Sequence, residues 1–161
     1  MHEVTVTRDL NHDAKTVWDL LDDFGSIYKY NPGVKSSELL TEKQTGIGAK
    51  RICKFYDGTS LKEEITQYKS GKGYTFELSE FSLPLKKAYT KFEVVPVNSG
   101  HSRIKVSLQF TPKFGPVGWL MANLMMKPML KKALSGLLKG VDDHLSSGKM
   151  VGPKGKLLQA A

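Results

Sequence analysis

The chain contains a single cysteine, Cys53, in 161 residues, so no internal disulfide can form. Such sparing use of cysteine is typical of proteins in a reducing compartment. The sequence lacks any run near the roughly 18 apolar residues that a membrane-spanning helix requires. Its first residues, Met1-His2-Glu3-Val4, do not begin a basic and then apolar signal segment. We therefore expect a cytoplasmic protein without stable membrane insertion.

Arginine is also scarce, because Arg8, Arg51 and Arg103 are the only arginines in a chain whose net charge is +8. Arginine is the favoured partner of phosphates and base edges, and no segment interleaves arginines with aromatic residues. The lysines are scattered along the chain. This distribution predicts a solvated basic surface and no nucleic-acid partner.

Residues for metal or nucleophilic chemistry are few as well. None of the four histidines falls on the inward face of a predicted strand. No metal-ligand spacing, phosphate-binding glycine loop, Ser/His/Asp arrangement or Cys/His pair can be placed. We expect no metal and no cofactor.

The length favours one domain of α+β class, which we place at residues 1–147 with a flexible tail at 148–161. Residues 2–10 alternate as a first strand, and two short helices follow, the first with Asn11 or Asp13 as its cap and ending at Gly25. Turn residues then separate six strands, near 34–42, 49–56, 60–69, 73–81, 86–95 and 102–111. One long helix, from about Pro116 to Ser147, closes the chain and should cover the sheet.

Two charged residues break the apolar alternation of these strands. Glu63 shares a strand face with Leu61 and Ile65, and Arg51 shares one with Cys53 and Phe55. A three-residue loop such as Asp57-Gly58-Thr59 would set Glu63 opposite Cys53 and diagonal to Arg51.

A charge facing an apolar interior is costly unless it pairs with another charge, with water or with a ligand. Arg51 and Glu63 are therefore the candidate site, with an ion pair at the sheet rim that binds nothing as the alternative. Glu80 follows Phe76 and Leu78 at a spacing of two residues and could therefore face the interior as well.

The last helix carries an apolar stripe, and its first half is apolar almost all round. Pro128 should kink or break it. This half could form a cavity wall or hinged lid, ordinary core or dimer contact, or an interfacial segment whose Lys127, Lys131 and Lys132 meet anionic lipid. The predicted ligand-binding set comprises Arg51, Cys53, Phe55, Leu61, Glu63, Ile65, Tyr74, Phe76, Leu78, Val106, Leu108, Trp119, Asn123, Met126 and Leu130.

An ordered set of motifs resembles the START-like helix-grip superfamily, SRPBCC, and within it the polyketide cyclase/dehydrase and lipid-transport group. The motifs are residues 17–24 (VWDLLDDF), 30–34 (YNPGV), 46–51 (GIGAKR), 61–64 (LKEE), 102–104 (SRI) and 110–112 (FTP). The resemblance implies a curved seven-stranded antiparallel sheet wrapped around a long C-terminal helix, with a deep, mostly apolar cavity.

The resemblance implies ligand binding without specifying one reaction. The favoured hypothesis is a monomeric or homodimeric binder or carrier of a small hydrophobic molecule, such as a lipid, sterol or polyketide, with one polar or acidic group. A cyclase or dehydratase would instead use Glu63 as general acid or base, with Arg51 orienting a carbonyl. A third hypothesis is an interaction module that makes transient membrane or dimer contacts through its methionine-rich helix.

Overall fold

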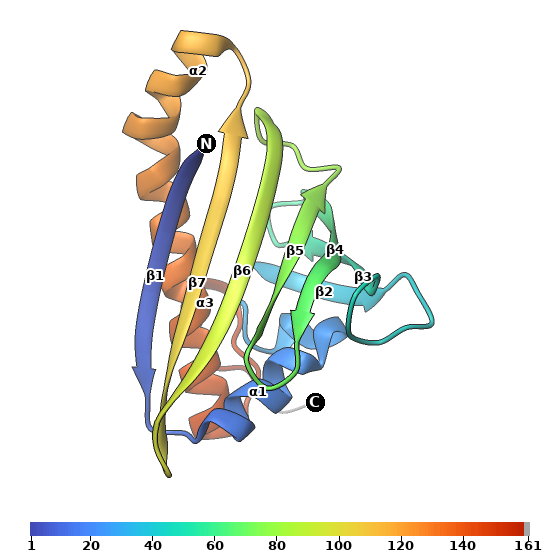
Figure 1. Cartoon of the computed structure of the whole chain (residues 1–161), viewed down its shortest axis with the longest axis vertical. Coiled ribbons are helices and arrows are strands. Elements are labelled where there is room, and N and C mark those ends of the chain that lie inside the picture. The colour runs from blue at the N-terminus through green and yellow to red at the C-terminus, as the bar shows by residue number, and fades with distance from the viewer. Residues whose placement is uncertain (160–161) are drawn as a thin grey trace.

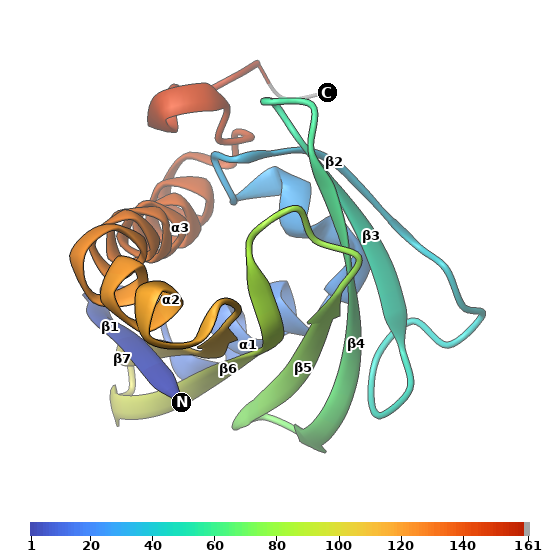
Figure 2. The same ribbon diagram turned by 90° about the horizontal axis from the view of Figure 1, so that it is seen from above.

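The computed structural model describes residues 1–159 and shows one antiparallel sheet of seven strands in the order β1-β7-β6-β5-β4-β3-β2. The predicted helix-grip fold is confirmed: the sheet curves, and the long C-terminal helix runs beside β1 and β7 (Figures 1 and 2). The strands are β1 (His2–Leu10), β2 (Val34–Leu39), β3 (Lys50–Phe55), β4 (Ser60–Lys69), β5 (Gly73–Ser79), β6 (Leu85–Asn98) and β7 (His101–Pro112).

Two short helices follow β1, as predicted. Asp13 is the cap of α1 (Ala14–Asp22), because its side chain accepts a hydrogen bond of 2.6 Å from the amide of Thr16. The first helix ends at Asp22 and not at Gly25, since Asp23 leaves the helical region of backbone space. The 3₁₀ helix η1 (Phe24–Lys29) then begins, and Phe24 turns into the core.

Strand β6 extends past its predicted end at residue 95. Proline removes a ladder donor, but Pro96 lies where the β6–β7 register shifts, a position that tolerates this loss. At the other end of β6, Pro84 belongs to the predicted bend between β5 and β6. Glu80 does not face the interior as its parity suggested. It has a positive φ of 52° at this bend and pairs on the surface with Lys62.

Pro128 was predicted to kink or break the C-terminal helix, and the break does not occur, because helical structure is continuous from Gly115 to Ser147. Its parts are α2 (Gly115–Met121), the π-helical turn η2 (Ala122–Met126) and α3 (Lys127–Ser147). A proline within an α-helix lacks one donor and its ring collides with the carbonyl four residues earlier. The wider turn of η2 immediately before Pro128 accommodates both effects without ending the helix.

Helix α3 packs closely against the rest of the molecule. Leu138 and Val141 are buried, and Asp142 accepts two hydrogen bonds from the Arg8 guanidinium of β1. A Cβ atom at Gly140 would lie 1.9 Å from the carbonyl oxygen of Tyr30. Glycine is therefore required where α3 crosses the segment after η1.

Residues 149–159 form a defined arrangement within the range 148–161 that was predicted as a flexible tail, and residues 160–161 of that range lie outside the described part of the chain. Val151 is buried, its amide donates to the carbonyl of Lys29, and it forms a β-bridge with Leu157. The short 3₁₀ helix η3 (Pro153–Gly155) makes the turn between these two residues. The glycines and proline that suggested disorder are used to form this turn, and apolar Val151 anchors it.

No helix in residues 1–159 is both long enough and apolar enough to span a membrane.

Candidate functional site

The interior holds a cavity of about 370 Å³ between the sheet and α3. Its wall is mostly apolar and is built from β3, β4, β5, β6, β7, η1 and α3. Seven of the predicted ligand-binding residues line it: Phe55, Leu61, Glu63, Phe76, Leu78, Leu108 and Leu130. The period-two pattern of the strands therefore identified much of the wall.

Five other predicted residues are buried but do not line the cavity. They are Arg51, Cys53, Ile65, Tyr74 and Val106. They share strand faces with lining residues, but they are covered by other side chains, as Phe24 covers Arg51. Strand parity predicts which face a residue occupies but not what covers it.

Three predicted residues from the first half of the C-terminal helix lie outside the cavity wall. Trp119, Asn123 and Met126 do not line the cavity, and Trp119 is 59% exposed. Asn123 donates to the carbonyl of Trp119, 3.0 Å away, and Met126 is buried outside the cavity. The helix wall of the cavity instead begins at Met129 and continues through Ala133, Leu134 and Leu137.

Some lining residues were missed although a signal for them existed. Ala88, Thr90 and Phe92 alternate on the inward face of β6, and all three line the cavity. Their parity in β6 could have identified them in the same way as Phe76 and Leu78 in β5.

The charged pair predicted from the alternation is present with a different register. Arg51 lies directly opposite Glu63, and Cys53 lies opposite Leu61. The hairpin loop is three residues long, as predicted, but it comprises Tyr56-Asp57-Gly58, because Phe55 donates to the carbonyl of Thr59. The Asp57 side chain accepts from the amide of Thr59 at 2.8 Å and so favours this turn.

Arg51 is completely enclosed, and its guanidinium has three neighbours. Nε donates to Glu63 Oε2, and Nη1 donates to the carbonyl of Phe24 at 2.5 Å. Its Cζ atom stands 3.8 Å from the centre of the Phe24 ring, a cation–π contact. Burial lowers the pKa of Arg51, but the combined charges of Glu63, which has the largest part, and of Cys53, Tyr74 and Tyr30 outweigh this effect and raise the pKa overall. Arg51 is therefore a permanent buried cation.

Two buried polar atoms beside this pair have no hydrogen-bond partner within residues 1–159: Nη2 of Arg51 and the hydroxyl of Tyr30. Burial raises the pKa of Tyr30, so its hydroxyl stays protonated. Unsatisfied polar atoms at such depth are uncommon and are a feature of functional sites.

Glu63 connects the buried arginine to the cavity. Its Oε2 accepts from Arg51 and lies 3.7 Å from the thiol of Cys53. Oε1 accepts no hydrogen bond from the described residues, and Glu63 lines the cavity. One carboxylate oxygen is thus held by the protein while the other is available to a bound molecule.

The chemistry of Cys53 is restricted by its surroundings. Burial and then the neighbouring Glu63 charge raise the pKa of the thiol, which disfavours the reactive thiolate. No group of three or more His, Cys, Asp or Glu side chains within residues 1–159 is arranged to hold a metal ion.

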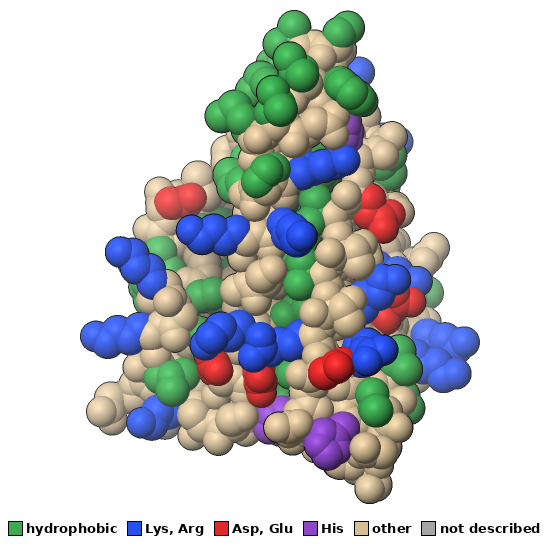
Figure 3. All heavy atoms as spheres, turned by 90° about the vertical axis from the view of Figure 1, so that its left-hand side faces the viewer, with side chains coloured by type: hydrophobic (Ala, Val, Ile, Leu, Met, Phe, Trp, Pro, Cys, Tyr) green, Lys and Arg blue, Asp and Glu red, His purple; other side chains and the backbone are tan. Residues whose placement is uncertain are grey.

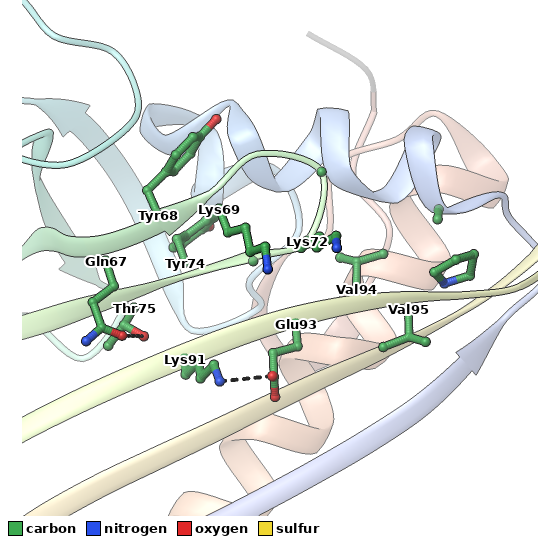
Figure 4. A pocket seen from close by; sticks show the side chains of 14 residues that line it. Gln67, Tyr68, Lys69, Lys72, Tyr74, Thr75, Lys91, Glu93, Val94 and Val95 are labelled. Carbon is green, nitrogen blue, oxygen red and sulfur yellow. Dashed lines mark hydrogen bonds and ion pairs between the residues drawn. The ribbon is translucent and has the colours of Figure 1, made fainter.

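A larger hollow of about 760 Å³ lies at the surface beside the β4–β5 turn and β6. Figure 4 shows that its wall mixes apolar residues such as Val94 and Val95 with polar ones. Lys91 pairs there with Glu93 at 2.9 Å, and Gln67 lies near Thr75. Tyr74 is its only member from the predicted set, and the Tyr74 hydroxyl already donates to the carbonyl of Leu21. Its wall includes four charged residues, Lys69, Lys72, Lys91 and Glu93, whereas two, Asp57 and Glu63, line the interior cavity among mostly apolar residues. The interior cavity is therefore the better candidate for an apolar ligand.

Several solved structures share the fold of this chain. A START superfamily protein from Mycobacterium smegmatis has a TM-score of 0.74 at 17% identity, over 91% of this chain and 98% of that one. Norcoclaurine synthase from Thalictrum flavum, in complex with dopamine and hydroxybenzaldehyde, has a TM-score of 0.70 at 13% identity, over 92% of this chain and 88% of that one. The di-domain ARO/CYC BexL has a TM-score of 0.74 at 11% identity, over 90% of this chain and 48% of that one.

Comparison by sequence identifies a family for this chain. None of the curated proteins matches the chain. Residues 1–145 match the family described as polyketide cyclase / dehydrase and lipid transport. The match covers most of the chain, which therefore belongs to the polyketide cyclase/dehydrase and lipid-transport family.

Proposed function

We propose that the protein binds and carries a small, mostly apolar molecule that bears one hydrogen-bond donor. The observation behind this proposal is an apolar cavity of about 370 Å³ with the Glu63 carboxylate in its wall. Sites for small molecules combine such apolar walls with a few placed polar groups. The volume is near the lower end of the usual range of roughly 300–1,000 Å³, which favours a compact ring system over a two-chain lipid.

The charge of the wall supports a hydroxyl or amine donor over the acidic group that was also considered. Glu63 and Asp57 both line the cavity, whereas no lysine or arginine among the described residues does. Arg51 could neutralise an acid only if it left Glu63 and the carbonyl of Phe24. A carboxylate ligand would therefore face like charge without a compensating cation.

The enzymatic alternative keeps one supporting observation, which is the accessible carboxylate. Glu63 could act as general acid or base toward a molecule in the cavity. The second role predicted for this mechanism is not supported, because Arg51 is enclosed and does not line the cavity. A binder needs only the geometry that is present, and we therefore favour it.

Fluorescence titration with N-phenyl-1-naphthylamine tests the proposal, since this neutral aromatic probe carries one N–H donor. We expect one probe per protein. Ala133→Trp, which places a large side chain at the cavity wall, should weaken binding at least about tenfold, the cost of losing a few buried methylene contacts. Ser135→Trp, on the solvent-facing side of the same helix, is the matched control and should bind as the unmodified protein does.

Two results would overturn the proposal: the absence of any stoichiometric binding, or equal binding by both tryptophan variants. Native mass spectrometry of the purified protein, followed by organic extraction, would identify any molecule that it already carries. A released carboxylic acid would contradict the predicted donor chemistry.

A further inference from the structure

An exposed apolar surface at one end of the C-terminal helix has no role in the cavity. We call it the apolar cap and define it as Phe114, Val117, Trp119, Leu120, Leu124 and Met125, which are each 52–68% exposed. Figure 1 shows α2 extending past the end of the sheet, and Figure 3 shows hydrophobic side chains gathered at that tip. Single exposed apolar residues are ordinary, but a contiguous group marks an interaction surface.

The cap is exposed because the sheet ends below it. Only Gly118, Ala122 and Met126 of this segment are buried, and they lie four residues apart on one helix face. The other faces of α2 and η2 contact nothing within the described residues that would hide them. Burial inside this chain therefore does not explain the apolar composition of the segment.

The charge of the helix segment that carries the cap is of one sign. Residues 113–141 contain Lys113, Lys127, Lys131, Lys132 and Lys139 and no aspartate or glutamate. The first four make no ion pair with any residue of the range 1–159. In Figure 3 lysine and arginine side chains lie directly below the apolar tip.

This charge distribution favours a lipid surface over a second copy of the chain. A two-fold dimer through the cap would bring the lysines of one helix toward those of the other, with no carboxylate in the segment to pair them. An anionic bilayer offers acyl chains to the apolar residues and phosphates to the lysines at once. We propose that the apolar cap inserts into the headgroup region of an anionic membrane.

The residues of the cap suit this role individually. Tryptophan is enriched at membrane interfaces, and Trp119 is at the centre of the exposed segment. Lysines can extend their charged ends to the phosphates while their stems stay in apolar surroundings. The helix continues through Met129 and Leu130 into the cavity wall. Docking would therefore place the cavity wall beside the lipid. The use of that wall to bind a ligand rests on the proposed function, whereas the docking of the cap to a membrane does not.

Vesicle binding tests the proposal with a built-in reporter. Trp119 is exposed, whereas the only other tryptophan, Trp18, is buried. Vesicles of phosphatidylcholine with phosphatidylglycerol should shift the tryptophan emission to shorter wavelength and co-sediment the protein. Vesicles of phosphatidylcholine alone should do neither, and added salt should weaken the binding to the anionic vesicles.

Two sets of variants separate the apolar and the charged contributions. Leu124→Asp with Met125→Asp should weaken binding at least about tenfold, since two apolar contacts are lost. The control is Ile47→Asp with Val97→Asp, two similarly exposed apolar residues outside the cap. Changing Lys127, Lys131 and Lys132 to glutamine should weaken binding on the order of a hundredfold, whereas the same change at Lys35, Lys54 and Lys72 should have a much smaller effect at equal net charge.

Each remaining outcome would overturn the proposal. These outcomes are no binding, equal binding to both kinds of vesicle, or equal loss in the test and control variants, with circular dichroism confirming that every variant is folded. A concentration-dependent dimer that Leu124→Asp with Met125→Asp abolishes, without vesicle binding, would assign the cap to a second copy. The probe titration is separate, because Ala133→Trp should leave vesicle binding intact.

Discussion

The two halves of the C-terminal helix differ in how their apolar residues are used. Residues 115–129 are the more continuously apolar half, and most of their side chains are exposed. Residues 130–147 are mixed in composition, but Leu134, Leu137, Leu138 and Val141 are buried against the sheet. Apolar content therefore does not predict burial here. What decides it is whether a partner surface lies opposite the helix.

The packed half is also tied to the charged pair beneath the cavity. Gly140 of α3 lies against the carbonyl of Tyr30, and η1, which ends just before Tyr30, supplies the Phe24 carbonyl that holds Arg51. The apolar cap has no such connections. If this comparison is correct, substitutions in the packed region should affect stability, and those in the cap should affect association only.

Arg51→Met should have the largest effect on stability. Removing the cation leaves Glu63 nearly buried without a counter-charge, which costs about 3–5 kcal/mol in comparable cases. Urea unfolding at neutral pH measures this loss. Arg51→Met combined with Glu63→Leu should recover most of it, because no unpaired charge then remains. If Arg51→Met alone left the stability unchanged, water in the cavity would be sufficient to solvate the Glu63 carboxylate without Arg51.

Leucine truncation compares the two halves directly. Leu138 is 1% exposed and Leu124 is 68% exposed. Leu138→Ala should destabilise the protein by about 2–5 kcal/mol through lost burial and a residual cavity. Leu124→Ala should change the free energy of unfolding by less than about 0.5 kcal/mol. Similar losses at both positions would show that the cap is packed in solution, for example in a dimer.

Two glycines of α3 make a finer comparison. A Cβ at Gly136 would meet the Pro32 ring at an ordinary 3.6 Å, whereas one at Gly140 would overlap the Tyr30 carbonyl. Gly140→Ala should cost about 1–3 kcal/mol from overpacking. Gly136→Ala should instead stabilise the helix by up to about 1 kcal/mol. Thermal unfolding of the two variants should therefore shift in opposite directions.

The smallest effect is expected from acidification near the cap. His2 was predicted to lie off the inward strand faces, but it shares the buried face of β1 with Val4 and stacks on Phe110. Burial lowers the pKa of His2, with help from the charges of Lys127 and the N-terminus. As the pH falls, His2 takes up a proton in the unfolded chain before it does so in the folded protein. The contribution of neutral His2 to stability is therefore complete above the ordinary pKa of 6.5 and is lost as the pH falls through the lower pKa of His2 in the folded protein.

His2→Phe keeps the stacking but cannot titrate. Its unfolding free energy should therefore depend less steeply on pH below 6.5 than that of the unmodified protein. Parallel curves for the two proteins would contradict the assignment of this slope to His2.

Much of the fold could be predicted because its signals are local. Alternation located every strand within a few residues, and the inward faces of β4 and β5 identified Glu63, Phe76 and Leu78 as residues of the interior. The register of Arg51 and Glu63 was less accessible. A turn one residue earlier than predicted shifts the pairing of β3 with β4 by two positions. Glu63 therefore stays on the same face of the sheet, but it lies opposite Arg51 instead of Cys53.

The cavity wall was harder to predict than the sheet. Trp119 and Leu137 occupy the same apolar stripe, yet only Leu137 reaches the cavity. The tail after Gly148 poses the same problem, because Val151 becomes an anchor only where Lys29 lies beside it. Both outcomes depend on elements distant in sequence, which local patterns do not contain.

The sequence alone determined the strands and the main helices to within a few residues, and the inward faces of β3, β4 and β5, because backbone geometry ties these to periods of two and 3.6 residues. It also determined that Arg51 and Glu63 share the interior. Only the tertiary structure decided that Glu63 reaches the cavity while Arg51 does not, and that half of the last helix extends beyond the sheet. These outcomes depend on which elements pack against one another, because the burial of a side chain is set by the surface packed opposite it and not by the residue type alone.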